Sequence, residues 1–210
     1  MLRKLFTLIT LGILTGGTVQ ASHISGGEIY WDCIGPNEYT ITLILYRDCA
    51  GIPVGNTETV TINSPCGSQT VTVTSPGGTE ISQLCDQELP NSTCNGGNLP
   101  GIEEYVFTGT VTLTPCDSWT MSWTQCCRNA AVANLTNPDV QDTYIEATLN
   151  NLIAPCDDSP EFTNEPIPYV CLGYPITFSY GVFDPDAESL SYELISAMQG
   201  GGAPLGYDFP

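Results

Sequence analysis

Ten cysteines constrain this chain more than any other feature of its sequence, and all of them follow residue 21. No two have the Cys-x-x-Cys spacing of a zinc site, and His23 is the sole histidine. An even number of cysteines in an exported chain is typical of a disulfide framework. We therefore predict that all of them form disulfides: Cys33, Cys49, Cys66, Cys85, Cys94, Cys116, Cys126, Cys127, Cys156 and Cys171.

Export is predicted from residues 1–21. Arg3 and Lys4 precede an apolar stretch at residues 5–14, and residues 19–21 (Val-Gln-Ala) approximate a small-x-small cleavage pattern. The apolar stretch is about half the roughly 20 residues that a bilayer span requires. We interpret residues 1–21 as a signal peptide, so the mature chain is expected to be secreted and not to span a membrane.

The mature chain is strongly anionic. Loss of Arg3 and Lys4 changes the formal net charge from −19 to −21 and leaves Arg47 and Arg128 as the basic side chains. Nucleic acid is excluded as a partner, because phosphate binding needs the opposite sign. In such a chain a guanidinium group is expected to be held by carboxylates or carbonyls, so we predict that Arg47 and Arg128 are structural clamps beside disulfides. The alternative is that an arginine binds an anion or carboxylate ligand.

The run from Trp119 to Asn129 predicts a half-buried strand. At a period of two, one face collects four of its residues: Trp119, Met121, Trp123 and Cys127. Adjacent cysteines rarely bond to each other, so Cys126 and Cys127 are each expected to reach a different partner. The most local disulfide that we expect is Cys85–Cys94.

Alternating patterns recur along the chain, and long stretches of helix-forming residues are missing. We expect an all-β fold, with a disulfide-rich β-sandwich of the immunoglobulin type at residues 22–159. Strands are predicted there at 28–33, 39–46, 58–62, 69–74, 104–113, 119–129 and 143–149. Residues 160–210 are interpreted as the truncated start of a second, immunoglobulin- or cadherin-like sandwich, with strands at 169–171, 176–183 and 190–194.

Four sequence blocks carry a family resemblance: 23–31 (His-Ile-Ser-Gly-Gly-Glu-Ile-Tyr-Trp), 45–49 (Leu-Tyr-Arg-Asp-Cys), 126–129 (Cys-Cys-Arg-Asn) and 160–164 (Pro-Glu-Phe-Thr-Asn). Together they resemble the N-terminal region of large secreted surface proteins of Bacteroidetes-type bacteria. Those proteins include gliding-motility-associated proteins with PKD- or cadherin-like repeats, exported by type IX secretion. The resemblance implies a bacterial cell-surface location, further domains of the same polypeptide, and surface glycans or proteins as partners.

A calcium site is the metal hypothesis. Three acids alternate in a predicted loop: Asp184, Asp186 and Glu188. Calcium takes about six to eight oxygen ligands, and further acids near the domain junction could supply some of them: Asp157, Asp158 and Glu161. Ile195 stands where an EF-hand has its bidentate glutamate, so the loop is not an EF-hand. The resemblance to cadherin-like modules departs here, because Ala187-Glu188 replaces their usual Gly-Asp. The alternative is a polar turn with solvated acids.

Catalysis has little support in the sequence. No lysine follows the leader, Gly-x-Ser-x-Gly is absent, and His23 lies at the mature N-terminus. We therefore assign no catalytic residue and expect a non-catalytic adhesion or stalk module of a larger protein. The alternative is a carbohydrate-binding module in which exposed tyrosines and tryptophans stack on sugars. A third interpretation is an accessory part of a glycoside hydrolase, or an enzyme with a carboxylate pair.

Overall fold

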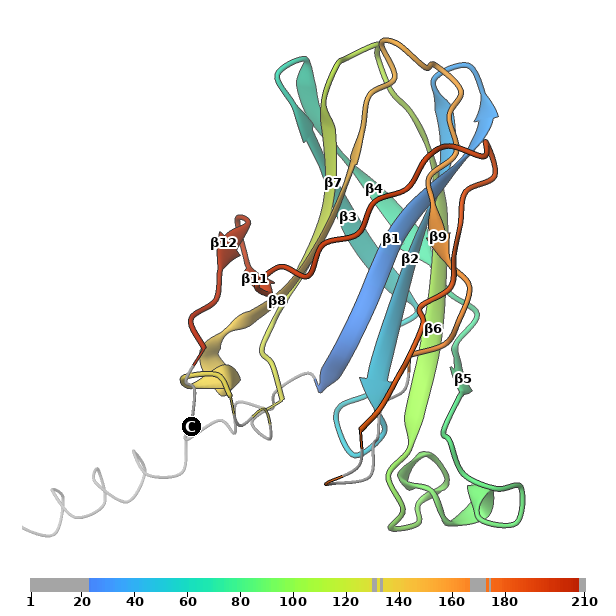
Figure 1. Cartoon of the computed structure of the whole chain (residues 1–210), viewed down its shortest axis with the longest axis vertical. Coiled ribbons are helices and arrows are strands. Elements are labelled where there is room, and N and C mark those ends of the chain that lie inside the picture. Colours follow the sequence, from blue (N-terminus) through green and yellow to red (C-terminus); the bar gives the residue numbers. More distant parts are fainter. Residues whose placement is uncertain (1–22, 130–131, 133, 167–172, 174, 208–210) are drawn as a thin grey trace, which may run out of the picture.

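The computed structural model of this protein describes residues 23–129, 132, 134–166, 173 and 175–207, and its regular structure is mostly β (Figure 1). The predicted signal peptide, Cys171 and the predicted strand at 169–171 lie outside these residues. The elements are β1 (Ile24–Gly35), β2 (Glu38–Asp48), β3 (Thr57–Ser64), β4 (Gly67–Thr74), β5 (Gly78–Glu80), η1 (Leu89–Asn91), η2 (Thr93–Asn95), β6 (Ile102–Thr112), β7 (Trp119–Cys126), η3 (Pro138–Val140), β8 (Asp142–Leu149), β9 (Glu161–Phe162), β10 (Val182–Phe183), β11 (Met198–Gln199) and β12 (Ala203–Pro204).

One eight-stranded antiparallel sheet forms the body of the protein. Its order is β1-β2-β6-β4-β3-β7-β8, with β5 beside β6. The sheet curls until β8 returns to β1, so it is nearly closed into a barrel (Figure 1). Gly27 of β1 permits this approach, because a Cβ there would meet the Ile44 carbonyl oxygen and lie 2.6 Å from Cδ1 of Ile145 in β8. The prediction of an all-β, disulfide-rich fold is confirmed, and the facing layers belong to one continuous sheet.

The core lies inside the curled sheet and follows the alternation of the strands. On β7, Trp119, Met121 and Trp123 are at most 3% exposed, as the period-two pattern predicted. The predicted inner face of β2 is fully buried: Tyr39, Ile41, Leu43 and Leu45 are each 0% exposed. Burial of a large apolar side chain is worth about 1.5–3 kcal/mol, so this core contributes to stability alongside the disulfides.

The hairpin of β1 and β2 turns at Pro36-Asn37, where Gly35 pairs with Glu38. Asn37 has a φ of 62°, a left-handed conformation that asparagine adopts more readily than most residues. Its backbone N–H donates to the Pro155 carbonyl oxygen at 2.7 Å. The first hairpin is therefore tied at its tip to the loop that follows β8.

Four disulfides join the described cysteines: Cys33–Cys156, Cys49–Cys94, Cys66–Cys116 and Cys126–Cys127. The prediction of a Cys85–Cys94 disulfide is wrong. Cys49 follows β2, and its N–H donates to the Gly101 carbonyl oxygen just before β6, so the pairing of these two strands brings Cys49 to the loop that holds Cys94. Cys85 is exposed and bonds to no described cysteine.

The expectation that Cys126 and Cys127 reach different partners is also wrong. It assumed that Cys127 continues the strand, but β7 ends at Cys126 and the two sulfurs bond to each other across a cis peptide bond. Cys127 is 5% exposed and lies on the predicted core side, whereas Cys126 is exposed. This disulfide consequently ties no other segment to β7.

The C-terminal segment contains little regular structure. Of the predicted strands at 176–183 and 190–194, the structure has a strand only at β10, which pairs with β9. Apart from β10, the alternating residues there have no strand partner within the described part of the chain. The segment instead runs along the large sheet (Figure 1): the Asp186 carboxylate accepts the backbone N–H of Asp158, and β11 packs against β8.

Candidate functional site

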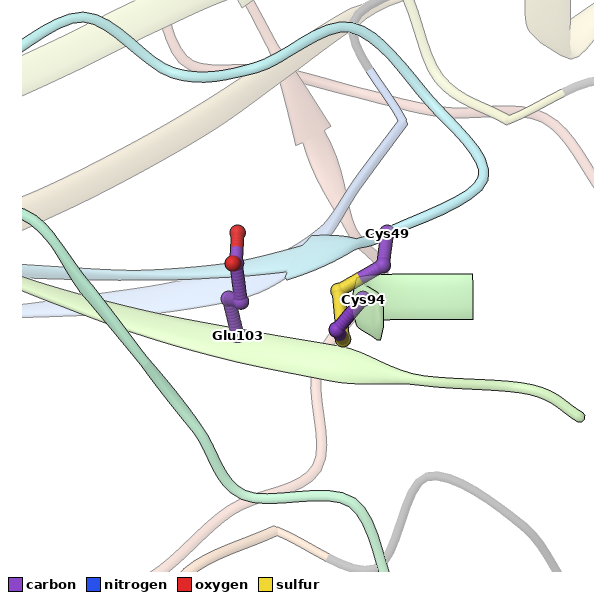
Figure 2. A group of neighbouring side chains, drawn as sticks. All are labelled: Cys49, Cys94 and Glu103. Atoms are coloured by element: carbon purple, nitrogen blue, oxygen red, sulfur yellow. A yellow bond between two sulfur atoms is a disulfide. The ribbon is translucent and has the colours of Figure 1, made fainter. Parts of the chain in front are cut away.

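Arg47 lies in β2 and is 7% exposed. Its guanidinium pairs with the Glu103 carboxylate of β6. It also donates to three carbonyl oxygens of the loop after β2, at 3.3, 2.7 and 2.8 Å: those of Cys49, Gly51 and Ile52. These contacts hold the loop around the Cys49–Cys94 disulfide (Figure 2), which is the clamp geometry that the sequence suggested.

A group of potential metal ligands lies at the same place. Within the part of the chain that the structure describes, Cys49, Cys94 and Glu103 are the one group of three whose candidate ligand atoms all lie within 4.8 Å of one another (Figure 2). The two sulfurs are bonded to each other, so neither is the thiolate that binds a metal. Glu103 is also paired with Arg47. The disulfide and this ion pair are therefore a structural cross-link.

Arg128 directly follows the Cys126–Cys127 disulfide and is held differently. Its Nε donates to the Asp142 carbonyl oxygen at 3.0 Å and its Nη2 to the Met198 carbonyl oxygen at 2.9 Å, which links β8 to β11. No described carboxylate oxygen lies within 4.0 Å of this guanidinium. Burial lowers the pKa of Arg128, while Tyr207 and Asp142 oppose that shift.

The predicted calcium ligands lie in the loop after β10. Asp184 is 8% exposed, and its Oδ1 accepts the backbone N–H groups of Asp186 at 2.9 Å and Glu188 at 3.3 Å. The Asp186 carboxylate accepts the N–H of Asp158 at 2.9 Å. The pKa of Asp157 is raised, first by burial and then by four neighbouring carboxylates: Glu188, Asp186, Asp184 and Asp158. The structure therefore brings Asp157 and Asp158 to the loop.

Carboxylate oxygens are the ligands that calcium prefers, so the chemistry of this acidic loop fits the ion. Its geometry is open, because no three of these acids hold oxygens within 4.8 Å of one another. Asp184 Oδ1 is already occupied by backbone N–H groups. Glu161 lies in β9 opposite Phe183, the residue before Asp184, and its charge acts on Glu28 and Tyr30.

A second acidic group, which the sequence did not single out, surrounds Tyr46 of β2. The Tyr46 hydroxyl donates to Glu28 Oε1 at 2.9 Å. Burial raises the pKa of Glu28, the Tyr46 hydrogen bond opposes this, and the charges of Glu104 and Glu161 add to it. The pKa of Glu104 is raised by burial and by Glu165. Sequence could not find this group, because it depends on the neighbouring positions of β1, β2 and β6.

The aromatic residues divide into a buried and an exposed set. Trp31, Trp119 and Trp123 are at most 6% exposed, so the expectation that tryptophans stack on an external ligand is wrong. The exposed set lies in the C-terminal segment, where Tyr180 is 58% and Tyr192 is 70% exposed. These two tyrosines line a hollow of about 290 Å³ together with Phe162.

Comparison of the chain with protein-family models, curated proteins and solved structures found no match. No helix among the described residues has the length and apolar character of a membrane crossing.

Proposed function

We propose that this protein is a non-catalytic extracellular surface module, which acts as a load-bearing stalk or adhesion unit of a larger multidomain protein. Disulfides persist in the oxidising environment outside the cell, which supports secretion. The observation that carries the stalk role is the Cys33–Cys156 disulfide, whose cysteines are 123 residues apart in sequence.

This disulfide sets the path by which a pulling force crosses the domain. Cys33 lies near the end of β1, and Cys156 lies in the loop after β8, so the bond joins the two strands at the edges of the sheet. A force applied between the N-terminal residues and the C-terminal segment passes through the covalent bond. Because the chain between the two cysteines cannot be extended while that bond is intact, most of the sheet is shielded from the load.

Single-molecule force spectroscopy tests this role, with handles at the two ends of the mature chain. The oxidised protein is expected to resist extension of residues 33–156. A reducing agent should add roughly 400 Å to the unfolded length, since the 123-residue separation extends by about 3.4 Å per residue. Full extension without a reductant would contradict the load-bearing role.

A carbohydrate-binding module is the second candidate, and the aromatic hollow supports it. The ring centroids of Phe162 and Tyr180 lie 5.5 Å apart, and Tyr192 completes the exposed aromatic wall. Flat aromatic rings bury apolar area at little cost in conformational entropy, and sugar rings offer apolar C–H faces. A glycan array should give a saturable signal that Tyr180→Ala abolishes. No signal, or an unchanged signal for the variant, would count against this role.

We also propose that the acidic loop binds calcium, with Asp184, Asp186 and Glu188 as ligands and Asp157 as a neighbour. Calorimetric titration should show binding at millimolar calcium or below, and Asp186→Asn should weaken it. Glu193→Gln, an exposed acid outside the loop, is the matched control. Absence of heat at millimolar calcium would end this proposal.

The sequence blocks around Cys49 and Cys126 support a further proposal, that the chain is the N-terminal part of a Bacteroidetes-type surface protein exported by type IX secretion. In cells that express the whole polypeptide, external protease should then degrade the protein without lysis. Protection until lysis would contradict a surface location.

A further inference from the structure

A hollow of about 230 Å³ lies beside Arg128, between the start of β1 and the residues after the Cys126–Cys127 disulfide. Its walls are Ile24, Ser25, Arg128, Asn129 and Val132. Pockets for drug-sized ligands measure about 300–1,000 Å³, so this one suits a smaller group such as a single sugar ring.

Arg128 gives the hollow its chemistry. A guanidinium offers more N–H donors than the two that Asp142 and Met198 use, and both of those acceptors are neutral carbonyls. Arg47, by contrast, has a carboxylate partner. Arg128 is therefore a partly buried cation that lines the hollow, and no described carboxylate lies within ion-pair distance of its guanidinium.

The other walls favour a ligand with hydroxyl groups. The Ser25 hydroxyl can donate and accept hydrogen bonds, and the Asn129 amide, which donates to Asp48 Oδ2 at 3.4 Å, adds a second polar wall. Ile24 and Val132 add apolar surface, against which the C–H face of a ring can pack. A ligand that is only a carboxylate would contact Arg128 alone. A sugar acid would also contact the polar and the apolar residues of the hollow.

We propose that this hollow binds a carboxylate-bearing sugar, a hexuronic acid unit of an acidic glycan. The carboxylate pairs with the Arg128 guanidinium, a charge-assisted contact that a neutral sugar cannot make. The ring hydroxyls bond to the Ser25 hydroxyl. The site is separate from the aromatic hollow of Tyr180, so it stands whether or not that hollow binds sugar.

The test is a calorimetric or NMR titration of the full, oxidised mature chain with three probes: glucuronate, glucose and acetate. Glucuronate should bind saturably, and glucose and acetate at least about tenfold more weakly, since tenfold corresponds to one good contact. Equal affinity for glucose would overturn the role of Arg128. Equal affinity for acetate would overturn the assignment of a sugar ring.

Two variants locate the site. Arg128→Gln should remove the preference for glucuronate over glucose, but it also breaks the contacts to Asp142 and Met198 and so perturbs the fold. Ser25→Leu fills the hollow from an exposed position and leaves the guanidinium intact. It should reduce glucuronate binding at least tenfold with an unchanged melting temperature. Thr72→Leu, at an exposed position of β4 outside both hollows, is the control that should leave glucuronate binding unchanged. Binding that survives Ser25→Leu would refute the proposal.

Discussion

The Cys33–Cys156 disulfide gives the sharpest test of how this domain is held together. Hydrogen bonds also hold the segments around Cys33 and Cys156 together. The Cys33 N–H donates to Asp158 Oδ1 at 2.6 Å, and the Ser159 N–H donates to the Trp31 carbonyl oxygen at 3.0 Å. We therefore expect a Cys33→Ser, Cys156→Ser double variant to keep the native fold and to lose stability mainly through a less restricted unfolded chain.

The magnitude follows from the loop that the disulfide closes in the unfolded chain. Cys66–Cys116 lies inside that loop and shortens it, because the path can run from Cys33 to Cys66, cross to Cys116 and continue to Cys156. The remaining loop has roughly 75 residues, for which the chain-entropy relation gives about 4.5 kcal/mol. With a slope of about 2 kcal/mol per molar urea, the unfolding midpoint should fall by about 2 M.

The assay is equilibrium urea unfolding followed by tryptophan fluorescence, since the three tryptophans are buried. The matched control is Cys126→Ser with Cys127→Ser, which removes a disulfide between adjacent residues and hence a negligible loop. The control should lose far less stability than the Cys33, Cys156 variant. Equal losses in the two variants would refute the loop-entropy reasoning, as would a loss below about 1 kcal/mol in the first.

Three further predictions concern single side chains. The folded pKa of Glu28 lies above its unfolded value, so its deprotonation destabilises the fold and stability is gained as the pH falls from neutral towards about 4.3. Glu28→Gln should thus raise the melting temperature at pH 7.5 but not near pH 4. The exposed control Glu193→Gln should leave the melting temperature unchanged at both pH values. An equal effect of Glu28→Gln at both pH values would contradict this reasoning. Arg47→Ala should cost about 3–5 kcal/mol in urea unfolding because it leaves the Glu103 carboxylate without its ion-pair partner, and a variant as stable as the wild type would show that the clamp contributes nothing. Thr143 is 5% exposed and its hydroxyl has no hydrogen-bond partner among the described residues, so Thr143→Val should raise stability by about 1 kcal/mol in thermal melts; a lower melting temperature would mean that the hydroxyl is satisfied.

Local patterns predicted the strands well. Alternation at Trp119, Met121 and Trp123 is a property of a few consecutive residues, and it was sufficient to identify β7 and its buried face. The same reasoning failed in the C-terminal segment. There, of the alternating residues at 176–183, only Val182 and Phe183 found a partner strand, β9, and alternation without a partner does not make a sheet.

The sites were only partly accessible from sequence. The scarcity of cations predicted that Arg47 would be held by carboxylates or carbonyls, and its carboxylate partner is Glu103, more than fifty residues away. The Tyr46, Glu28 and Glu104 group had no local signal, because the three residues come from different strands. The hollow beside Arg128 likewise joins the start of β1 to the residues after β7.

The sequence by itself determined the all-β class, the buried faces of the main strands and the reliance on oxidised cysteines, because each of these follows from residue type and short-range period. Only the tertiary structure decided which cysteines meet, which acids become neighbours and where Arg128 points. Those outcomes depend on the order of strands across the curled sheet, and that order is set by the packing of the whole core rather than by any one segment.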